Sequence, residues 1–88
     1  HKSALVALDN FIADYPGTEY KEQALYYRLD SAYKLAVNSV PAKMQERLKN
    51  AKLAYTSLMK FKEGTQYKAK ADEMLAKIEQ DLKQYSNN

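Results

Sequence analysis

Hydrophobic residues recur along the chain at the three- and four-residue spacing of amphipathic helices, in four successive stretches. Glycine or proline separates one stretch from the next, at Pro16-Gly17, before Pro41 and at Gly64. We therefore predict four helices, at about residues 4–15, 19–38, 41–62 and 67–85.

The second stretch differs from the others because its apolar residues cover two sides of the helix. One side carries Tyr20, Ala24, Tyr27 and Leu35, and the other carries Tyr26, Leu29, Tyr33 and Ala36. A helix that is apolar on two sides packs between neighbours. The last stretch has a single apolar side, which suits the end of a helical stack.

The breaks predict how each helix ends and the next begins. Gly17 can adopt the positive φ of a helix C-cap, and Thr18 can cap the following helix. Asn38-Ser39 offers a polar cap for the third helix, and Pro41 suits the first turn of that helix.

One of these breaks occurs twice. Gly17-Thr18-x-Tyr20-Lys21-x-x-Ala24 returns 47 positions later as Gly64-Thr65-x-Tyr67-Lys68-x-x-Ala71, and the small residues Ala4 and Ala7 return as Ala51 and Ala54. Each copy is interpreted as the joint between one helical hairpin and the next, near 15–19 and 62–66. The predicted fold is all-α, with antiparallel hairpins stacked as a short α-solenoid in a single domain over 1–88.

Composition excludes most catalytic chemistry. The chain has no cysteine, its only histidine is His1, and no glycine-rich phosphate loop is present. The acidic pairs Asp72-Glu73 and Glu79 with Asp81 are expected to be solvated helix residues rather than metal ligands. We therefore predict no enzyme, no cofactor and no metal.

Charge is concentrated in one part of the chain. Residues 41–70 carry eight Lys or Arg and two Glu, whereas the flanking segments are weakly acidic. A basic third helix could meet an acidic protein surface, anionic lipid or nucleic acid, or it could simply be a solvated face. Nucleic acid is not expected, because no recognition motif interleaves the charges, and a steep loss of affinity with salt would test it.

Ala4, Leu8 and Pro16 have the spacing of the tetratricopeptide repeat (TPR) signature, although the 47-residue period exceeds the usual 34. Ala32-Tyr33-Lys34-Leu35-Ala36, Ser39, Arg47 and the segment 51–61 resemble later repeats of the BamD (YfiO) family of outer-membrane protein assembly lipoproteins. The fold expected from this resemblance is TPR-like.

The resemblance implies a non-enzymatic scaffold on the periplasmic face of the bacterial outer membrane. Its partners would be the β-barrel insertase and accessory lipoproteins, and its only membrane attachment would be an upstream lipid anchor. Tyr26, Tyr33 and Arg47 are the candidate partner-binding residues. Tyr26 and Tyr33 lie seven positions apart, on the side of the second helix that lines the concave surface of a TPR-like stack.

The alternative is a peptide-binding TPR adaptor or chaperone partner without a link to the outer membrane. We also expect the chain to be the C-terminal part of a longer protein. In isolation it would then expose an apolar face of the first helix and dimerise through it, which light scattering would test.

Overall fold

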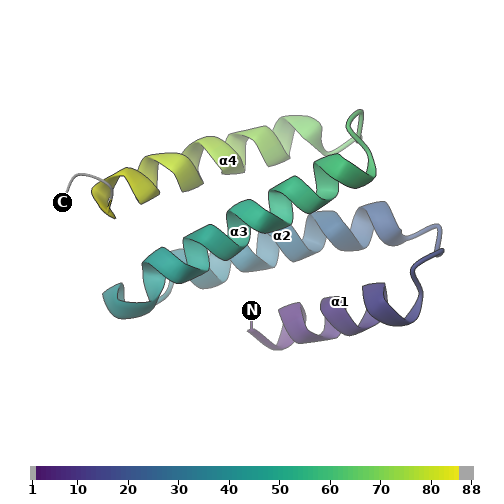
Figure 1. The fold of residues 1–88 in the computed structure, drawn as a ribbon, viewed down its shortest axis with the longest axis horizontal. Helices are drawn as coiled ribbons and strands as arrows, with labels where there is room; N and C mark the ends of the chain where they lie inside the picture. Colours follow the sequence, from purple (N-terminus) through teal and green to yellow (C-terminus); the bar gives the residue numbers. More distant parts are fainter. Residues whose placement is uncertain (1, 86–88) are drawn as a thin grey trace.

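The computed structural model describes residues 2–85, and these residues form four α-helices (Figure 1). The helices are α1 (Lys2–Asp14), α2 (Lys21–Val37), α3 (Pro41–Phe61) and α4 (Lys68–Leu82), and α4 is followed by a short 3-10 helix η1 (Lys83–Tyr85). The all-α prediction is confirmed, and each helix lies close to its predicted range. The second helix begins two residues later than expected.

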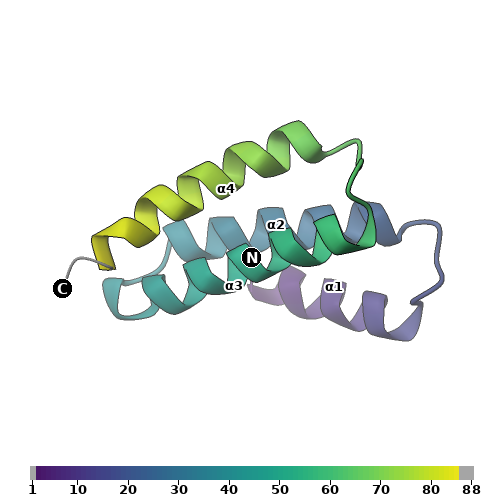
Figure 2. The ribbon, with the colours of Figure 1, turned by 45° about the horizontal axis from the view of Figure 1, so that its top comes forward.

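Consecutive helices run antiparallel, so the chain reverses direction at each turn (Figure 1). The helix α2 contacts α1, α3 and α4, which confirms that the helix with two apolar sides packs between neighbours. In both ribbon views α1 lies at one edge of the molecule and α4 at the opposite edge (Figure 2).

The core lies between α2, α3 and α4. Its largest fully buried side chains are Leu29, Leu48, Leu58 and Ile78. Alanines at Ala32, Ala36, Ala51, Ala54 and Ala71 are buried beside them, and such small side chains allow helix backbones to approach closely. The helix α1 contributes no buried residue.

Two side chains in the turn between α2 and α3 form hydrogen bonds back to the end of α2. The Asn38 side chain donates to the Lys34 carbonyl oxygen over 2.8 Å, and the Ser39 hydroxyl donates to the Leu35 carbonyl oxygen over 2.5 Å. Pro41 occupies the first turn of α3 as predicted. The expectation that Asn38 or Ser39 caps α3 is wrong, because both side chains satisfy the free carbonyl groups at the end of α2.

The two joints have the same backbone hydrogen bonds. In the first joint the Thr18 amide donates to the Tyr15 carbonyl over 3.1 Å and the Lys21 amide to the Thr18 carbonyl over 3.2 Å. The second joint repeats both bonds, from Thr65 to Lys62 over 3.2 Å and from Lys68 to Thr65 over 3.1 Å.

Two expectations about the joints are wrong. Neither glycine has a positive φ, because each joint is made of two consecutive tight turns that do not need a left-handed residue. Thr18 does not cap α2 directly. Its hydroxyl oxygen instead accepts the Tyr20 amide over 3.2 Å, within the turn that precedes the helix.

Candidate functional site

A groove between α2 and α4 contains two of the three predicted partner-binding residues. Tyr26 and Tyr33 line it from α2, and Met74 lines it from α4. Its other lining residues are charged: Asp30, Lys34, Lys70, Glu73 and Lys77. The groove thus combines aromatic and apolar side chains with charged ones, a combination typical of protein-binding surfaces.

The tyrosines are fixed by the packing of the helices. The Tyr26 ring stacks on the Tyr67 ring, with centroids 4.3 Å apart and planes 6° from parallel. Burial, followed by the negative charge of Asp30, raises the pKa of the Tyr26 hydroxyl above its usual value. Tyr33 is half-buried against the core. Each ring is therefore held in place with part of its surface available.

The groove has a surplus of positive charge. Lys34 pairs with Asp30 over 2.9 Å, and the hydrogen bond from this lysine to Asp30 raises the Lys34 pKa. Lys77 pairs with Glu73 over 3.7 Å. Lys70 has no ion pair among residues 2–85, so its charge is available to an acidic group entering the groove.

Arg47, the third predicted residue, does not line this groove. Its guanidinium donates to the Ser39 hydroxyl oxygen over 2.7 Å, and Ser39 in turn donates to the end of α2. This contact holds the α2–α3 turn against α3, so Arg47 has a structural contact that its position in the sequence did not reveal.

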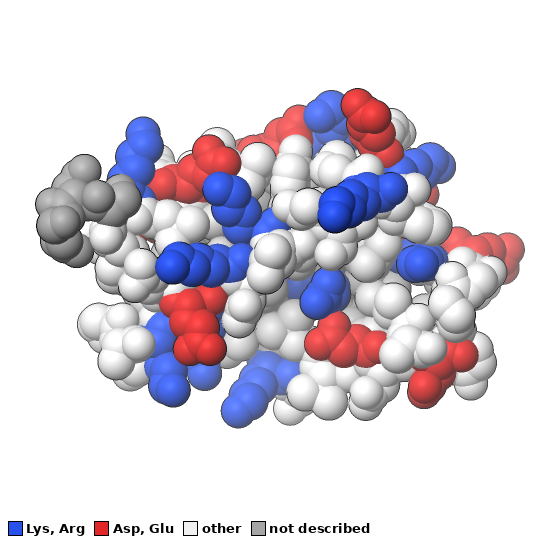
Figure 3. Space-filling view, in the orientation of Figure 1, with Lys and Arg blue, Asp and Glu red and all other residues white. Residues whose placement is uncertain are grey.

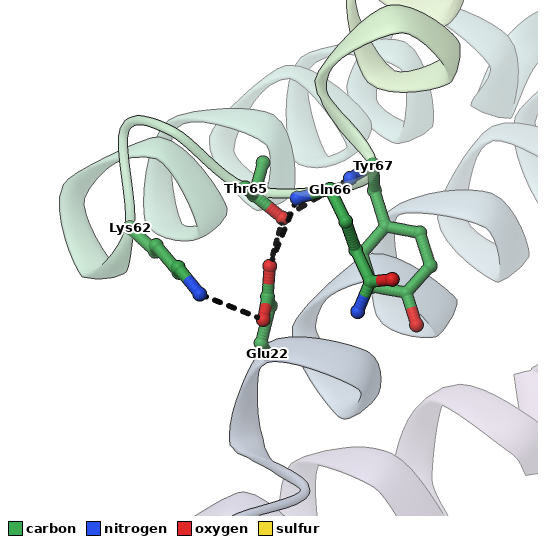
Figure 4. A network of polar contacts seen from close by, with 5 residues as sticks. All are labelled: Glu22, Lys62, Thr65, Gln66 and Tyr67. Carbon is green, nitrogen blue, oxygen red and sulfur yellow. Dashed lines mark hydrogen bonds and ion pairs between the residues drawn. The ribbon is translucent and has the colours of Figure 1, made fainter.

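A cluster of polar contacts joins the start of α2 to the second joint, between α3 and α4 (Figure 4). The Glu22 carboxylate, in the first turn of α2, accepts a hydrogen bond from the buried Thr65 hydroxyl, the Gln66 amide over 3.2 Å and the Lys62 ammonium over 3.5 Å. These partners, led by Thr65, hold the Glu22 pKa below its ordinary value, although partial burial opposes them. The carboxylate therefore fastens the second joint to α2.

A further bond that the sequence did not suggest links α3 to α4. The Tyr55 hydroxyl donates to Asp72 over 2.6 Å, and Lys68 pairs with the same carboxylate over 3.0 Å. The bond to Asp72, together with burial, raises the Tyr55 pKa to about 12, and the same bond lowers the Asp72 pKa. Asp72 is thus more than the solvated helix residue expected from sequence.

The basic segment does not form one uniform surface. Lys52 pairs with Glu79 over 3.7 Å, while Lys62 and Lys68 pair with Glu22 and Asp72. On the face in Figure 3, Lys and Arg lie interspersed with Asp and Glu. The charge of the basic segment 41–70 is therefore partly offset within the fold.

Within residues 2–85, no cluster of three or more metal-binding side chains is found. His1 lies outside the described residues. The same part of the chain has no helix long and apolar enough to cross a bilayer. No protein-family model, curated protein or solved structure matches this chain.

Proposed function

We propose that this chain is a non-enzymatic TPR-like scaffold that binds a protein segment in the groove between α2 and α4. The observation that supports this proposal most is the groove itself. Tyr26, Tyr33 and Met74 line it together with Lys70, which has no ion pair in the described part of the chain, 2–85. Tyrosine and methionine are enriched in protein interfaces because they combine large apolar contact with adaptability.

The chemistry of the groove favours a segment with an apolar anchor and an acidic group. The anchor would contact the tyrosine rings, and the acidic group would pair with Lys70. Because Lys34 and Lys77 already have carboxylate partners, one negative charge in the ligand suits the groove better than a long acidic run.

The proposed setting is the outer-membrane β-barrel protein assembly machinery. It rests on the BamD-like segment around Ala32–Ala36 and Arg47, and on the repeated joints of a TPR-like α-solenoid. In this setting the protein that carries the chain sits on the periplasmic face of the outer membrane and is held there by a lipid anchor. Its partners are the β-barrel insertase and accessory lipoproteins.

The second candidate is a peptide-binding adaptor or chaperone partner not linked to the outer membrane. The surplus positive charge at Lys70 favours it, because this charge suits one acidic group in the tail of a soluble client. Both candidates use the same groove, so the identity and location of the partner distinguish them.

The test is affinity purification of the protein that carries this chain from detergent-solubilised envelopes, followed by mass spectrometry. Recovery of a β-barrel insertase in stoichiometric amount supports the assembly scaffold. Recovery of soluble clients only, or absence of the protein from the membrane fraction, favours the adaptor.

Two charge reversals then locate the binding surface. Lys70→Glu changes the groove, whereas Lys49→Glu changes an exposed residue of α3 outside it. We expect Lys70→Glu to reduce partner recovery about tenfold and Lys49→Glu to leave it unchanged. Equal recovery with both variants contradicts binding in the groove.

A further inference from the structure

The first joint has the same backbone conformation and hydrogen bonds as the second, but no helix among residues 2–85 packs over it. The N-cap residues Tyr20 and Tyr67 have nearly identical backbone angles, with φ of −92° in both and ψ of 7° and 5°. Thr18 accepts the Tyr20 amide over 3.2 Å, just as Thr65 accepts the Tyr67 amide over 3.3 Å. The two joints therefore present equivalent groups in equivalent positions.

In the second joint these groups are covered by α2. The Thr65 hydroxyl and the Gln66 amide donate to Glu22 (Figure 4). The Tyr67 ring stacks on Tyr26. Glu22 and Tyr26 are four residues apart and so share one face of α2. The second joint is therefore covered by a hydrogen-bond acceptor and an aromatic ring that lie four residues apart on one helix.

In the first joint the same groups have no cover. No residue in 2–85 accepts the Thr18 hydroxyl proton or the Glu19 amide proton. The Tyr20 ring has no stacking partner there, and 57% of this residue is exposed.

The adjoining helix shows the same difference. Ala51 and Ala54 of α3 are 0% and 2% exposed, because neighbouring helices cover them. Their equivalents in α1, Ala4 and Ala7, are both exposed. These small residues allow close helix packing in α3, whereas no helix among residues 2–85 covers their equivalents in α1.

We propose that α1 and the first joint form a docking surface for one further helix, contributed from outside residues 2–85. This first-joint surface consists of Ala4, Ala7, Thr18, Tyr20 and the Glu19 amide. The helix that fits it presents a hydrogen-bond acceptor and an aromatic ring four residues apart, in the arrangement of Glu22 and Tyr26. The surface is separate from the α2–α4 groove, so the proposal does not depend on the proposed function.

Two differences between the joints specify the acceptor. Tyr15 stands where the second joint has Lys62, and Glu19 stands where it has Gln66. The first joint therefore lacks the cation that pairs with Glu22 and adds a negative charge. A carboxylate arriving there would meet a like charge, so an uncharged glutamine or asparagine fits better than glutamate.

A second copy of this chain does not supply the acceptor and the ring from the positions that cover the second joint. In such a copy, Glu22 and Tyr26 of α2 already contact Thr65 and Tyr67 of that copy's own second joint. Its α4 carries Ala69 and Glu73 at the positions equivalent to Glu22 and Tyr26. Neither helix offers a free acceptor and an aromatic ring at these equivalent positions. Gln23 and Tyr27 of α2 have the same four-residue spacing and are exposed, so the concentration dependence measured below decides whether a second copy docks through them.

The experiment supplies the helix by fusion. A second copy of residues 21–48 is placed directly before residue 2, which preserves the 47-residue offset and continues the added third helix into α1 in phase. Three fusions are compared by amide hydrogen exchange. The added copy carries Glu22→Gln in the first, no change in the second, and both Glu22→Ala and Tyr26→Ala in the third.

In the Glu22→Gln fusion we expect exchange of the Glu19 amide to slow by about tenfold relative to the unfused chain. The unchanged fusion should protect it less, and the double-alanine fusion should not protect it. Equal protection in all three fusions, or none in any, overturns the proposal. Concentration-dependent protection in the unfused chain would assign the surface to a second copy and would also overturn it.

If the fusion is insoluble, a second measurement on the unfused chain tests the proposal. A peptide of residues 21–37 with Glu22→Gln is titrated into the chain and followed by amide chemical shifts. Shifts confined to α1 and the first joint, and lost with Tyr26→Ala in the peptide, support the proposal. Absence of these shifts at millimolar peptide, or shifts that persist with Tyr26→Ala, overturns it.

Discussion

The Glu22 carboxylate accepts a hydrogen bond from the hydroxyl of Thr65, a residue 43 positions further along the chain. Glu22 lies in the first turn of α2, whereas Thr65 lies in the joint that leads into α4. The bond therefore fixes the second hairpin against the first. It also makes the two copies of the Gly-Thr-x-Tyr motif unequal, because within residues 2–85 only the second copy has such a partner.

We expect Thr65→Val to lower the free energy of unfolding by about 1 kcal/mol, because valine lacks the buried hydroxyl that donates to Glu22 and accepts the Tyr67 amide. Thr18→Val is the matched control in the first joint, and its cost should stay within about 0.5 kcal/mol. Chemical denaturation measures both. Equal costs would mean that the bond to Glu22 contributes nothing to stability.

Stability should fall in acid. The Thr65 hydroxyl and its neighbours hold the folded-state pKa of Glu22 below 4.5, so the stabilisation is complete above that pH and is lost as the pH falls through the folded-state pKa. Asp72, with its pKa lowered by Tyr55 and Lys68, acts in the same direction. Melting temperatures from about pH 6 to about pH 2 measure the effect.

Substitution separates the contribution of Glu22 from the rest of this acid dependence. Glu22→Gln should make the melting temperature depend less steeply on pH. Glu46→Gln, at an exposed position of α3, should leave that dependence unchanged. A slope that is the same in the two variants would show that Glu22 does not link protonation to unfolding.

Tyrosine ionisation should reveal the bond between Tyr55 and Asp72. The folded-state pKa of Tyr55 is raised to about 12, so its stabilisation is complete below pH 10 and is lost as the pH rises toward 12. We expect Tyr55→Phe to remove the last tyrosine to ionise in an ultraviolet titration. Tyr15→Phe, at a residue 61% exposed, should leave that late phase intact. Disappearance of the late phase in Tyr15→Phe instead would contradict the assignment.

Neither joint needs its glycine for conformational reasons. Gly17 and Gly64 have no positive φ, and a Cβ atom added at either position would meet no atom within 4 Å. Alanine at each position should therefore raise the free energy of unfolding by about 0.4 to 1 kcal/mol, because it restricts the unfolded chain. Thermal denaturation of the single variants checks this. A loss of stability would mean that the joints require glycine after all.

Local sequence signals predicted the helices better than their ends. The spacing of apolar residues located all four helices, and Pro41 marked the start of α3. The polar residues near the turns were harder to interpret, because Asn38 and Thr18 can each bond to either side of a turn. Their actual partners depend on the backbone conformation that the packed helices impose.

The candidate site was predicted in part. Tyr26 and Tyr33 line one groove because they lie two helical turns apart on α2. Arg47 was grouped with them on resemblance alone, and the structure places its guanidinium against Ser39. The pairs Glu22–Thr65 and Tyr55–Asp72 were not predicted, since residues far apart in sequence leave no periodic signal of contact.

The sequence by itself determined the helices, their order and the repetition of the joint, because apolar periodicity and the residues at helix ends act over a few neighbouring positions. Only the tertiary structure decided that one joint is covered by Glu22 and Tyr26 while its copy is left open. The physical reason is that burial belongs to the packed assembly. Two copies of one motif become different when, among the described residues, a helix lies over one copy and none lies over the other.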